Sequence, residues 1–274
     1  MKWNKQLVLD EVKKLGKKLK RKPAKRDNSN LYSLSRKYFG TWNNMMKKAG
    51  YNVKFKQKIN LPKICPEFYY FLGLLSTDGH IQYETKGGKY KIMIFTSKKE
   101  EVKMIKRLIK ELFNYEASLR TKNYGFSKWE NYEIYISSKE LADFLSKLGI
   151  PPGKKSFSIK VPEIILQDSS ENVWHFIRGV FDGDGSILKT RNQVIFKIAM
   201  GSENFLKGIK DIFEKKGFDS VKFRKERDTL WDLRINKKKD IERLYALLYK
   251  NSKRYFYPRK REKWKTIHLK PTRL

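Results

Sequence analysis

The sequence predicts an α+β protein made of two similar halves that follow a small helical module, and three observations support this prediction. A motif near residue 75 recurs near residue 180, and each copy precedes the same succession of alternating and helical segments. Hydrophobic residues make up 39% of the chain, which is enough for packed cores. The 63 lysines and arginines against 29 acidic residues leave a net charge of +34, which favours a polyanionic partner.

Residues 1–58 are expected to form a basic helical DNA-binding module and a linker. They hold 18 basic and 3 acidic side chains, a net charge of +15. Apolar residues recur at helical spacing over 7–15 and again over 31–38, and Thr41 can cap a third short helix. Three such helices are typical of a helix-turn-helix-like module, although a basic cap with solvated lysines fits the same pattern. Residues 51–61 are expected to be a charged linker or a short strand.

Two halves are expected over residues 59–160 and 161–274. Between the two motif copies, Gly73, Asp78, Gly79 and Ile81 correspond to Gly179, Asp184, Gly185 and Ile187. Each copy is followed by a strand, a helix, further strands and a helix. The segments are 90–96, 101–113, 133–136 and 140–148 in the first half, and 193–200, 204–216, 231–235 and 240–249 in the second. A pseudo-twofold axis should relate the halves.

Small residues four positions apart allow the two motif helices to approach closely. Gly73 and Thr77 fall on one face of the first helix, and Gly179 and Gly183 fall on one face of the second. Helix backbones can touch where such residues meet. We therefore expect the two halves to pack on each other along these helices.

If the helices pack in this way, Asp78 and Asp184 emerge side by side where the helices end, and Gly79 and Gly185 turn the chain outward. Two adjacent carboxylates repel each other unless a cation or a shared proton neutralises them. Mg²⁺ is a hard ion that oxygen ligands hold, so the expected metal site comprises the two aspartates and the glycines beside them. In so basic a chain this centre would meet phosphate, which indicates metal-assisted phosphodiester hydrolysis.

Several other classes of protein do not fit the sequence. The single cysteine, Cys65, excludes an intramolecular disulfide scaffold, and three histidines with one cysteine cannot supply a zinc finger. A calcium loop starting at Asp182 lacks the required glycine and glutamate, because Ile187 and Gln193 occupy those positions. No long apolar run is present to span a bilayer. We expect a soluble cytoplasmic protein, associated with the nucleoid or located in an organelle.

Two segments resemble known motifs. Leu72-Gly-Leu-Leu-Ser-Thr-Asp-Gly and Ile177-Arg-Gly-Val-Phe-Asp-Gly-Asp-Gly resemble the two LAGLIDADG motifs of a single-chain homing endonuclease, and the resemblance covers residues 62–265. Residues 3–51 end in Tyr-Phe-Gly-Thr-Trp-Asn-Asn-Met-Met-Lys-Lys-Ala-Gly-Tyr. This segment resembles the helical repeat often attached to homing endonucleases.

The resemblance implies two pseudo-symmetric αββαββα halves, each presenting a saddle-shaped antiparallel sheet to the DNA major groove. It also implies that the last acidic residue of each motif, Asp78 and Asp184, binds divalent ions and positions the attacking water. The family often has an earlier acid in each motif. Here that acid is Asp182 in the second copy, whereas the first copy has Ser76.

A lysine near the metal site late in each half is a further implication of the resemblance. Lys154 or Lys155 fits in the first half, and Arg259 or Lys260 fits in the second. Lys155 and Lys260 are taken as the catalytic candidates. Contact with phosphate alone would explain these residues equally well.

Base reading would fall to the strands that follow each motif, because polar side chains there alternate with apolar ones that can pack beneath. The candidates in the first half are His80, Gln82, Tyr83, Thr85, Lys86, Lys89, Lys91 and Lys154. Those in the second half are Ser186, Lys189, Thr190, Arg191, Gln193, Lys197 and Arg259. Some of these side chains are expected to face solvent only.

The resemblance therefore predicts a monomeric, site-specific double-strand DNA endonuclease with a long, imperfectly palindromic target. The expected cofactor is Mg²⁺, with Mn²⁺ as a substitute, and neither a membrane nor an obligate protein partner is expected. Two alternatives on the same fold are an intron RNA maturase and a DNA-binding regulator that does not cleave. The maturase would need the basic surface but not the metal pair, so the presence of both aspartates argues against it.

Overall fold

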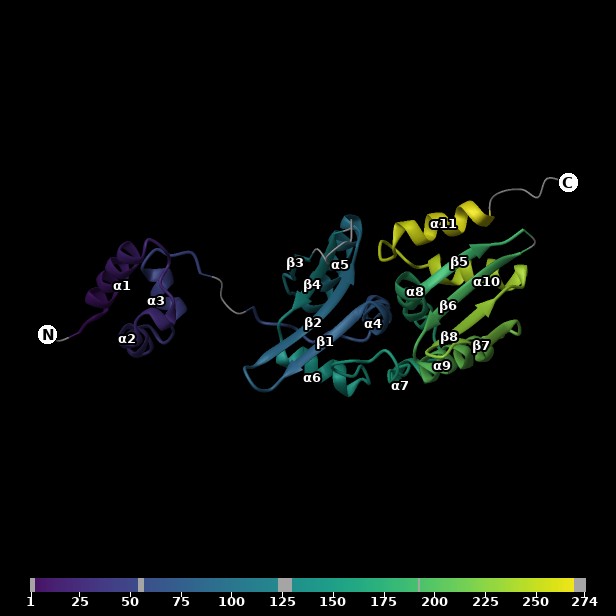
Figure 1. Ribbon diagram of the computed structural model, residues 1–274, viewed down its shortest axis with the longest axis horizontal. Coiled ribbons are helices and arrows are strands. Elements are labelled where there is room, and N and C mark those ends of the chain that lie inside the picture. The colour runs from purple at the N-terminus through teal and green to yellow at the C-terminus, as the bar shows by residue number, and fades with distance from the viewer. Residues whose placement is uncertain (1–2, 54–56, 123–129, 192, 269–274) are drawn as a thin grey trace. The chain divides into compact units, whose positions relative to one another are not determined.

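The computed structural model describes residues 3–53, 57–122, 130–191 and 193–268, and it contains two compact units (Figure 1). The first unit ends at Gln57 and the second begins at Lys58. The second unit holds two four-stranded antiparallel sheets flanked by helices. The α+β class predicted from the sequence is confirmed. None of the helices in the described ranges is both long and apolar enough to cross a membrane.

Three short helices form the N-terminal unit: α1 (Lys5–Leu19), α2 (Ser29–Phe39) and α3 (Trp42–Lys48), with a 3₁₀ turn, η1 (Lys25–Asp27), before α2. A polar side chain caps the start of each α-helix. For example, Thr41 Oγ1 accepts a hydrogen bond from Asn44 N at 3.1 Å, as its position in the sequence predicts. Buried Val8, Val12, Leu31 and Met45 from the three helices form the core of this unit.

The linker after the N-terminal unit contains neither helix nor strand in its described parts, residues 51–53 and 57–61. A strand at those positions is therefore wrong. Residues 54–56 lie outside the described ranges, so that part of the expected linker is not addressed.

Each half of the second unit follows the αββαββα order. In the first half, α4 (Pro66–Thr77), β1 (Gly79–Glu84), β2 (Lys89–Thr96), α5 (Lys99–Phe113), β3 (Ser118–Lys122), β4 (Asn131–Ile136) and α6 (Lys139–Lys147) follow one another. In the second half, the order is α8 (Val173–Asp184), β5 (Gly185–Lys189), β6 (Val194–Met200), α9 (Glu203–Lys215), β7 (Val221–Arg227), β8 (Leu230–Ile235) and α10 (Lys238–Tyr249). The short helix α7 (Glu163–Leu166) joins the halves, and α11 (Pro258–His268) follows the second.

The two sheets have the same topology, with strand orders β1-β2-β4-β3 and β5-β6-β8-β7. Strand residues alternate between a face that packs on helices and a concave face, because successive side chains of a strand point to opposite sides. Ile81, Ile92 and Ile134 are buried on the helix side of the first sheet. Ile187 and Phe196 are buried on that side of the second sheet. The concave faces are therefore left for polar side chains.

Helices α4 and α8 lie side by side between the two sheets, and their backbones touch at two glycines (Figure 1). A Cβ atom added to Gly73 would lie 2.3 Å from the carbonyl oxygen of Phe176. A Cβ atom added to Gly179 would lie 2.3 Å from the carbonyl oxygen of Tyr70. One turn further on, a Cβ on Gly183 would lie 2.1 Å from Thr77 Oγ1. The predicted small-residue contact is therefore present and is nearly symmetric.

Gly179→Ala is expected to destabilise the second unit by about 1–3 kcal/mol, because the added methyl group overlaps backbone atoms that cannot move independently. The better helix propensity of alanine, about 1 kcal/mol, would recover only part of this loss. Urea and thermal unfolding would measure the change. Gly208→Ala is the matched control, because the nearest atom to its added methyl group belongs to the side chain of Val161. A Gly179→Ala protein as stable as the control would contradict a tight helix contact.

Candidate active site and DNA-binding face

The ends of α4 and α8 bring Asp78 and Asp184 together. Asp78 is the residue at which α4 ends, Asp184 is the last residue of α8, and the glycine after each opens a strand. A Cβ on Gly183 would lie only 3.3 Å from Asp78 Oδ2. The close packing of the two helices therefore places both carboxylates at one point, as the sequence predicted.

The surroundings of these carboxylates favour their neutral forms. Burial raises the pKa of Asp78 to about 7, and the negative charge of Asp184 adds to this shift. The side chain of Asp184 reaches solvent on one side, but the protein around it still raises its pKa, against the opposing effect of Lys155 and Lys260. A divalent cation would relieve this unfavourable pairing of charges.

Lys155 and Lys260 flank the aspartates in similar ways. The buried Lys155 Nζ donates hydrogen bonds to the carbonyl oxygens of Ser76 at 2.7 Å and Thr77 at 3.1 Å, at the end of α4. The half-buried Lys260 Nζ donates to the carbonyl oxygen of Gly185, just after α8. Burial lowers the pKa of each lysine to about 8. Both amines are thus held next to the two carboxylates.

Asp182, the earlier acid of the second motif, lies in the interior. It is fully buried, and its Oδ2 accepts hydrogen bonds from Tyr70 Oη at 2.7 Å and from Tyr257 N at 2.8 Å. Burial raises its pKa to about 7, although these hydrogen bonds act in the opposite direction. Asp182 therefore joins α4 of the first half to the segment that carries Lys260. At the corresponding place in α4, the Ser76 hydroxyl donates to a carbonyl of its own helix.

A segment of the second half, residues 250–259, reaches across to the first half through several ion pairs and hydrogen bonds. Lys253 Nζ lies 2.7 Å from Glu67 Oε1, and Arg254 pairs with Glu111. Arg259 Nε donates to Glu101 Oε1 at 2.7 Å, and the Glu101 side chain is 2% exposed. The buried Arg178 supports this segment from α8, because its guanidinium donates to the carbonyl oxygens of Tyr255 and Leu248.

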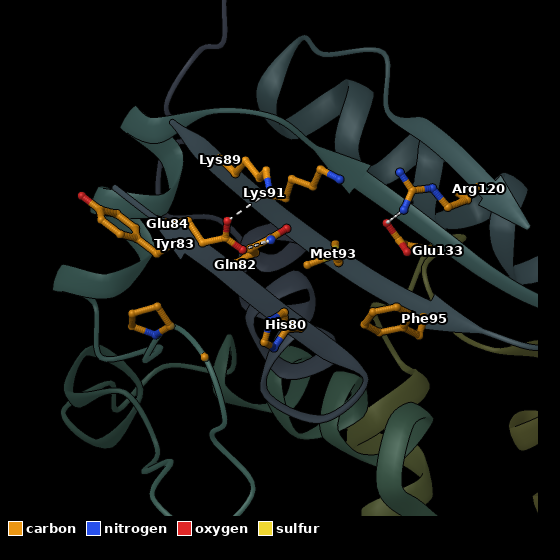
Figure 2. A pocket seen from close by; sticks show the side chains of 12 residues that line it. His80, Gln82, Tyr83, Glu84, Lys89, Lys91, Met93, Phe95, Arg120 and Glu133 are labelled. Atoms are coloured by element: carbon orange, nitrogen blue, oxygen red, sulfur yellow. Dashed lines mark hydrogen bonds and ion pairs between the residues drawn. The ribbon is translucent and has the colours of Figure 1, made fainter. Parts of the chain in front are cut away.

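The concave face of the first sheet forms a groove of about 750 Å³ (Figure 2). Predicted DNA-binding residues that line the groove are His80, Gln82, Tyr83, Lys89 and Lys91. Tyr83 also donates a hydrogen bond from its hydroxyl to Asp143 Oδ1 at 2.6 Å, on α6. Thr85 and Lys86 are exposed in the turn between β1 and β2, and Lys154 is exposed beside Lys155.

Predicted residues of the second half fall into three groups. Ser186 and Lys197 are cross-strand partners on the concave face. The exposed residues at or near the turn between β5 and β6 are Lys189, Thr190, Arg191 and Gln193. Arg259 lies apart from this sheet, in its ion pair with Glu101.

Sequence reasoning missed several concave-face residues because it considered only the strands directly after each motif. Arg120 lies on β3 and Tyr135 on β4 in the first half, and Arg224 lies on β7 and Arg234 on β8 in the second. Alternation was the available signal, since Val221-Lys-Phe-Arg interleaves apolar and charged residues in the manner of a half-buried strand.

Family models match both units of the chain. The LAGLIDADG-like domain matches residues 66–149 and 171–249, which contain the motif helices and both sheets. The homing endonuclease associated repeat matches residues 3–52, which contain the three N-terminal helices. Each match agrees with the resemblance drawn from the motifs.

Two curated proteins share part of this sequence. The chain is 28% identical over 178 residues to an A-type ATP synthase subunit of Pyrococcus abyssi, an alignment that covers 62% of this chain and 16% of that protein. It is also 28% identical over 178 residues to the DNA-directed RNA polymerase subunit Rpo1C of Methanocaldococcus jannaschii, covering 62% of this chain and 19% of that protein. The chain thus spans less than a fifth of the length of these two relatives.

Solved structures share the fold. The homing endonuclease I-WcaI, bound to its DNA recognition sequence, superposes with a TM-score of 0.55 at 13% identity, covering 80% of this chain and 92% of that one. A mesophilic variant of the homing endonuclease I-DmoI superposes with a TM-score of 0.51 at 18% identity, covering 71% of this chain and 95% of that one. At these identities the likeness is one of fold.

Without divalent cations, the aspartate pair should make the protein less stable at neutral pH than near pH 4. A carboxyl whose pKa is raised by folding binds its proton more tightly in the folded chain, so its stabilising contribution is lost as the pH rises from about 4 towards 7. Asp78→Asn should therefore raise the free energy of unfolding at pH 7.5 by about 1–3 kcal/mol and change it little at pH 4.

Thermal unfolding in EDTA at the two pH values would measure this effect. Asp228→Asn, which removes an exposed charge in the turn between β7 and β8, serves as the control. If Asp78→Asn and the wild-type protein lost the same stability between the two pH values, the coupling between the carboxylates would be refuted.

Proposed function

The chain belongs to the LAGLIDADG family, and we propose that it is a site-specific double-strand DNA endonuclease that hydrolyses phosphodiesters with a divalent cation. The observation that carries this proposal is the placement of Asp78 and Asp184 at the ends of two touching helices, between two concave sheets. Cationic side chains such as Lys91 and Lys197 lie on those sheets, where a DNA backbone would need them.

The residues at this centre fit Mg²⁺. Mg²⁺ is usually held by one or two carboxylates together with water and substrate phosphate, and two carboxyl groups with raised pKa values are present here. Among the described residues, no group of three or more histidine, cysteine, aspartate or glutamate side chains could hold a metal, so the protein offers only this sparse set. Asp78 and Asp184 would hold the ion, with the backbone of Gly79 and Gly185 beside them. The bound ion would neutralise charge on phosphate and lower the pKa of water.

Lys155 and Lys260 are proposed to act beside the metal site. The Lys155 amine donates to a carbonyl oxygen at the end of α4, and the Lys260 amine donates to a carbonyl oxygen at the start of β5. These hydrogen bonds hold each amine close to an aspartate. With pKa values near 8, they would be largely protonated at neutral pH and could stabilise charge that develops on phosphate. Contact with a phosphate alone would use the same placement.

The remaining assignments follow from charge and symmetry. We propose that the protein acts as a monomer, because its two halves already supply the pair of sites that a two-fold target requires. The unlike side chains of the two halves suit a long, imperfect palindrome.

The N-terminal unit, with its net charge of +15, is proposed to add a separate contact to DNA. Mn²⁺ is expected to substitute for Mg²⁺, and the cytoplasm is the proposed location.

Asp78→Asn and Asp184→Asn should each reduce cleavage at least about 10³-fold while largely preserving binding, because each removes a ligand of the divalent ion but leaves the concave faces intact. The target would first be selected from randomised duplex DNA in Ca²⁺. Cleavage would then be followed on gels in Mg²⁺, in Mn²⁺ and in EDTA.

The exposed-turn variant Asp228→Asn is the control and should cleave at the parental rate. Parental rates for either active-site variant would reject the assignment of the metal site. Tight, specific binding by the wild type without cleavage in Mg²⁺ or Mn²⁺ would instead indicate a regulator.

Affinity for DNA should fall steeply with salt, because cations on two sheets and on the N-terminal helices displace counterions from the phosphates. Between about 50 and 200 mM salt, we expect a loss of about 10³–10⁵-fold, corresponding to six to ten phosphate contacts. Fluorescence anisotropy at a series of salt concentrations would give the slope. A shallow slope, equivalent to about one or two phosphate contacts, would be inconsistent with such an interface.

A further inference from the structure

Each concave sheet face contains one buried carboxylate at the same position of its fold. Glu133 lies on β4 and Asp232 lies on β8, which occupy the same inner position in the two sheets. Glu133 is the cross-strand partner of Arg120, and Asp232 is the cross-strand partner of Arg224. The carboxylate side chains are 3% and 0% exposed. The arrangement thus occurs twice, related by the pseudo-twofold axis.

In the second half, three cations converge on Asp232. Arg234 donates to Asp232 Oδ2 from Nη2 at 2.6 Å and from Nε at 3.0 Å. Arg224 Nε lies 3.3 Å from Oδ1, and Lys197 Nζ lies 3.4 Å from Oδ2. Burial alone would raise the pKa of Asp232, but the hydrogen bonds from Arg234 and Arg224 outweigh burial and lower it. Asp232 is therefore a carboxylate at neutral pH.

The first half has a simpler version of this cluster, which Figure 2 shows beside the groove. Arg120 Nη1 lies 3.8 Å from Glu133 Oε1. The guanidinium of Arg120 also lies 5.8 Å from the centre of the Tyr135 ring, and Lys91 Nζ lies 4.9 Å from it. A carboxylate and an aromatic ring together restrict where the arginine can point.

A contribution to stability does not readily explain these buried acids. Removing a carboxylate from water costs several kcal/mol, and apolar residues would fill the same space with less penalty. The arginines, moreover, stay accessible: 48% of the Arg120 side chain and 55% of the Arg224 side chain are exposed. A carboxylate beneath an accessible arginine instead fixes the direction of a planar donor group.

The direction matters because the guanidinium carries the donor pair that matches O6 and N7 of guanine in the major groove. Asp232 contacts Arg224 through Nε, so this contact does not use the terminal nitrogens that form the donor pair. The carboxylates would also offset the attraction of these cations to phosphate, which is the same for every sequence.

We propose that Glu133 and Asp232 are specificity-determining positioning residues, which hold Arg120 in one half and Arg224 in the other so that they read guanine. This inference rests on the proposed function, since it concerns the DNA that the concave faces contact. The carboxylates do not touch the bases in this arrangement. They act through the arginines, and they lower affinity for DNA that lacks guanine at the matching positions.

Selection of preferred sites from randomised duplex DNA in Ca²⁺, followed by sequencing, would test this inference. Asp232→Asn should reduce the preference for guanine about tenfold at the base pairs read by the second half and leave those read by the first half unchanged. Glu133→Gln should reduce the preference for guanine at the base pairs read by the first half and leave those read by the second half unchanged. Arg224→Lys should reduce guanine preference at positions affected by Asp232→Asn, because lysine lacks the planar donor pair.

A second readout separates positioning from simple loss of structure. By fluorescence anisotropy, Asp232→Asn should bind an unrelated duplex about tenfold more tightly than the wild type, because Arg224 loses its internal partner while Lys197 and Arg234 keep only Glu226. Asp228→Asn, which removes the same charge from the exposed turn of the same half, should change neither the selected site nor this affinity. Glu133→Gln and Arg224→Lys keep the test decisive if Asp232→Asn does not fold.

Two outcomes would overturn the inference in distinguishable ways. If the wild type selected a site and folded Asp232→Asn or Glu133→Gln kept the same guanine preference, this inference alone would fail. If the wild type selected no site at all, the proposed function would fail and this inference with it.

Discussion

The contact between the backbones of α4 and α8 is the constraint on which the rest of the molecule depends. Two side chains consisting of a single hydrogen atom, those of Gly73 and Gly179, let the helices touch, and this contact brings two carboxylates from distant parts of the chain to one point. It also fixes the two sheets on either side, since each sheet begins at the glycine that follows its aspartate. The reactive centre and the two concave faces are therefore set by one helix pair.

Charge is arranged around this helix pair in layers. Negative groups lie at the centre, where burial raises the pKa values of both aspartates and the charge of Asp184 adds to the shift of Asp78, and lysines that donate to the neighbouring backbone carbonyls partly compensate. Positive side chains cover the concave faces, but acids such as Asp232 and Glu133 lie among them. A uniformly basic surface would attract any DNA, whereas on these faces the acids also fix the orientation of the arginine side chains that would contact DNA.

Much of the fold and the centre of the site could be predicted because they depend on local patterns and on repetition. Two copies of Gly-x-x-x-small followed by Asp-Gly were enough to predict the helix contact and the position of Asp78 and Asp184. What could not be predicted depends on contacts between residues far apart in the chain. Nothing local in Asp182 indicates that Tyr70 and the backbone of Tyr257 would meet it, and nothing in Arg259 indicates its pairing with Glu101. Helix α11 has few apolar residues, so its sequence predicts a basic cluster and does not indicate a helix.

The segment of residues 250–259 breaks the pseudo-twofold symmetry of the molecule, because it reaches from the second half to the first and its ion pairs have no counterpart in the opposite direction among the described residues. Lys253, Arg254 and Arg259 all reach from the second half to acids of the first. At the place in the second half that corresponds to Glu101, the first turn of α9 has the buried Phe205 instead, and the residue that corresponds to Arg259 is the exposed Lys154. Two copies of the second half would therefore place Arg259 against the apolar Phe205, whereas two copies of the first half would place Lys154 where Arg259 now meets Glu101. The two ends of the α4–α8 pair are therefore supported by different contacts, although the helices themselves meet almost symmetrically.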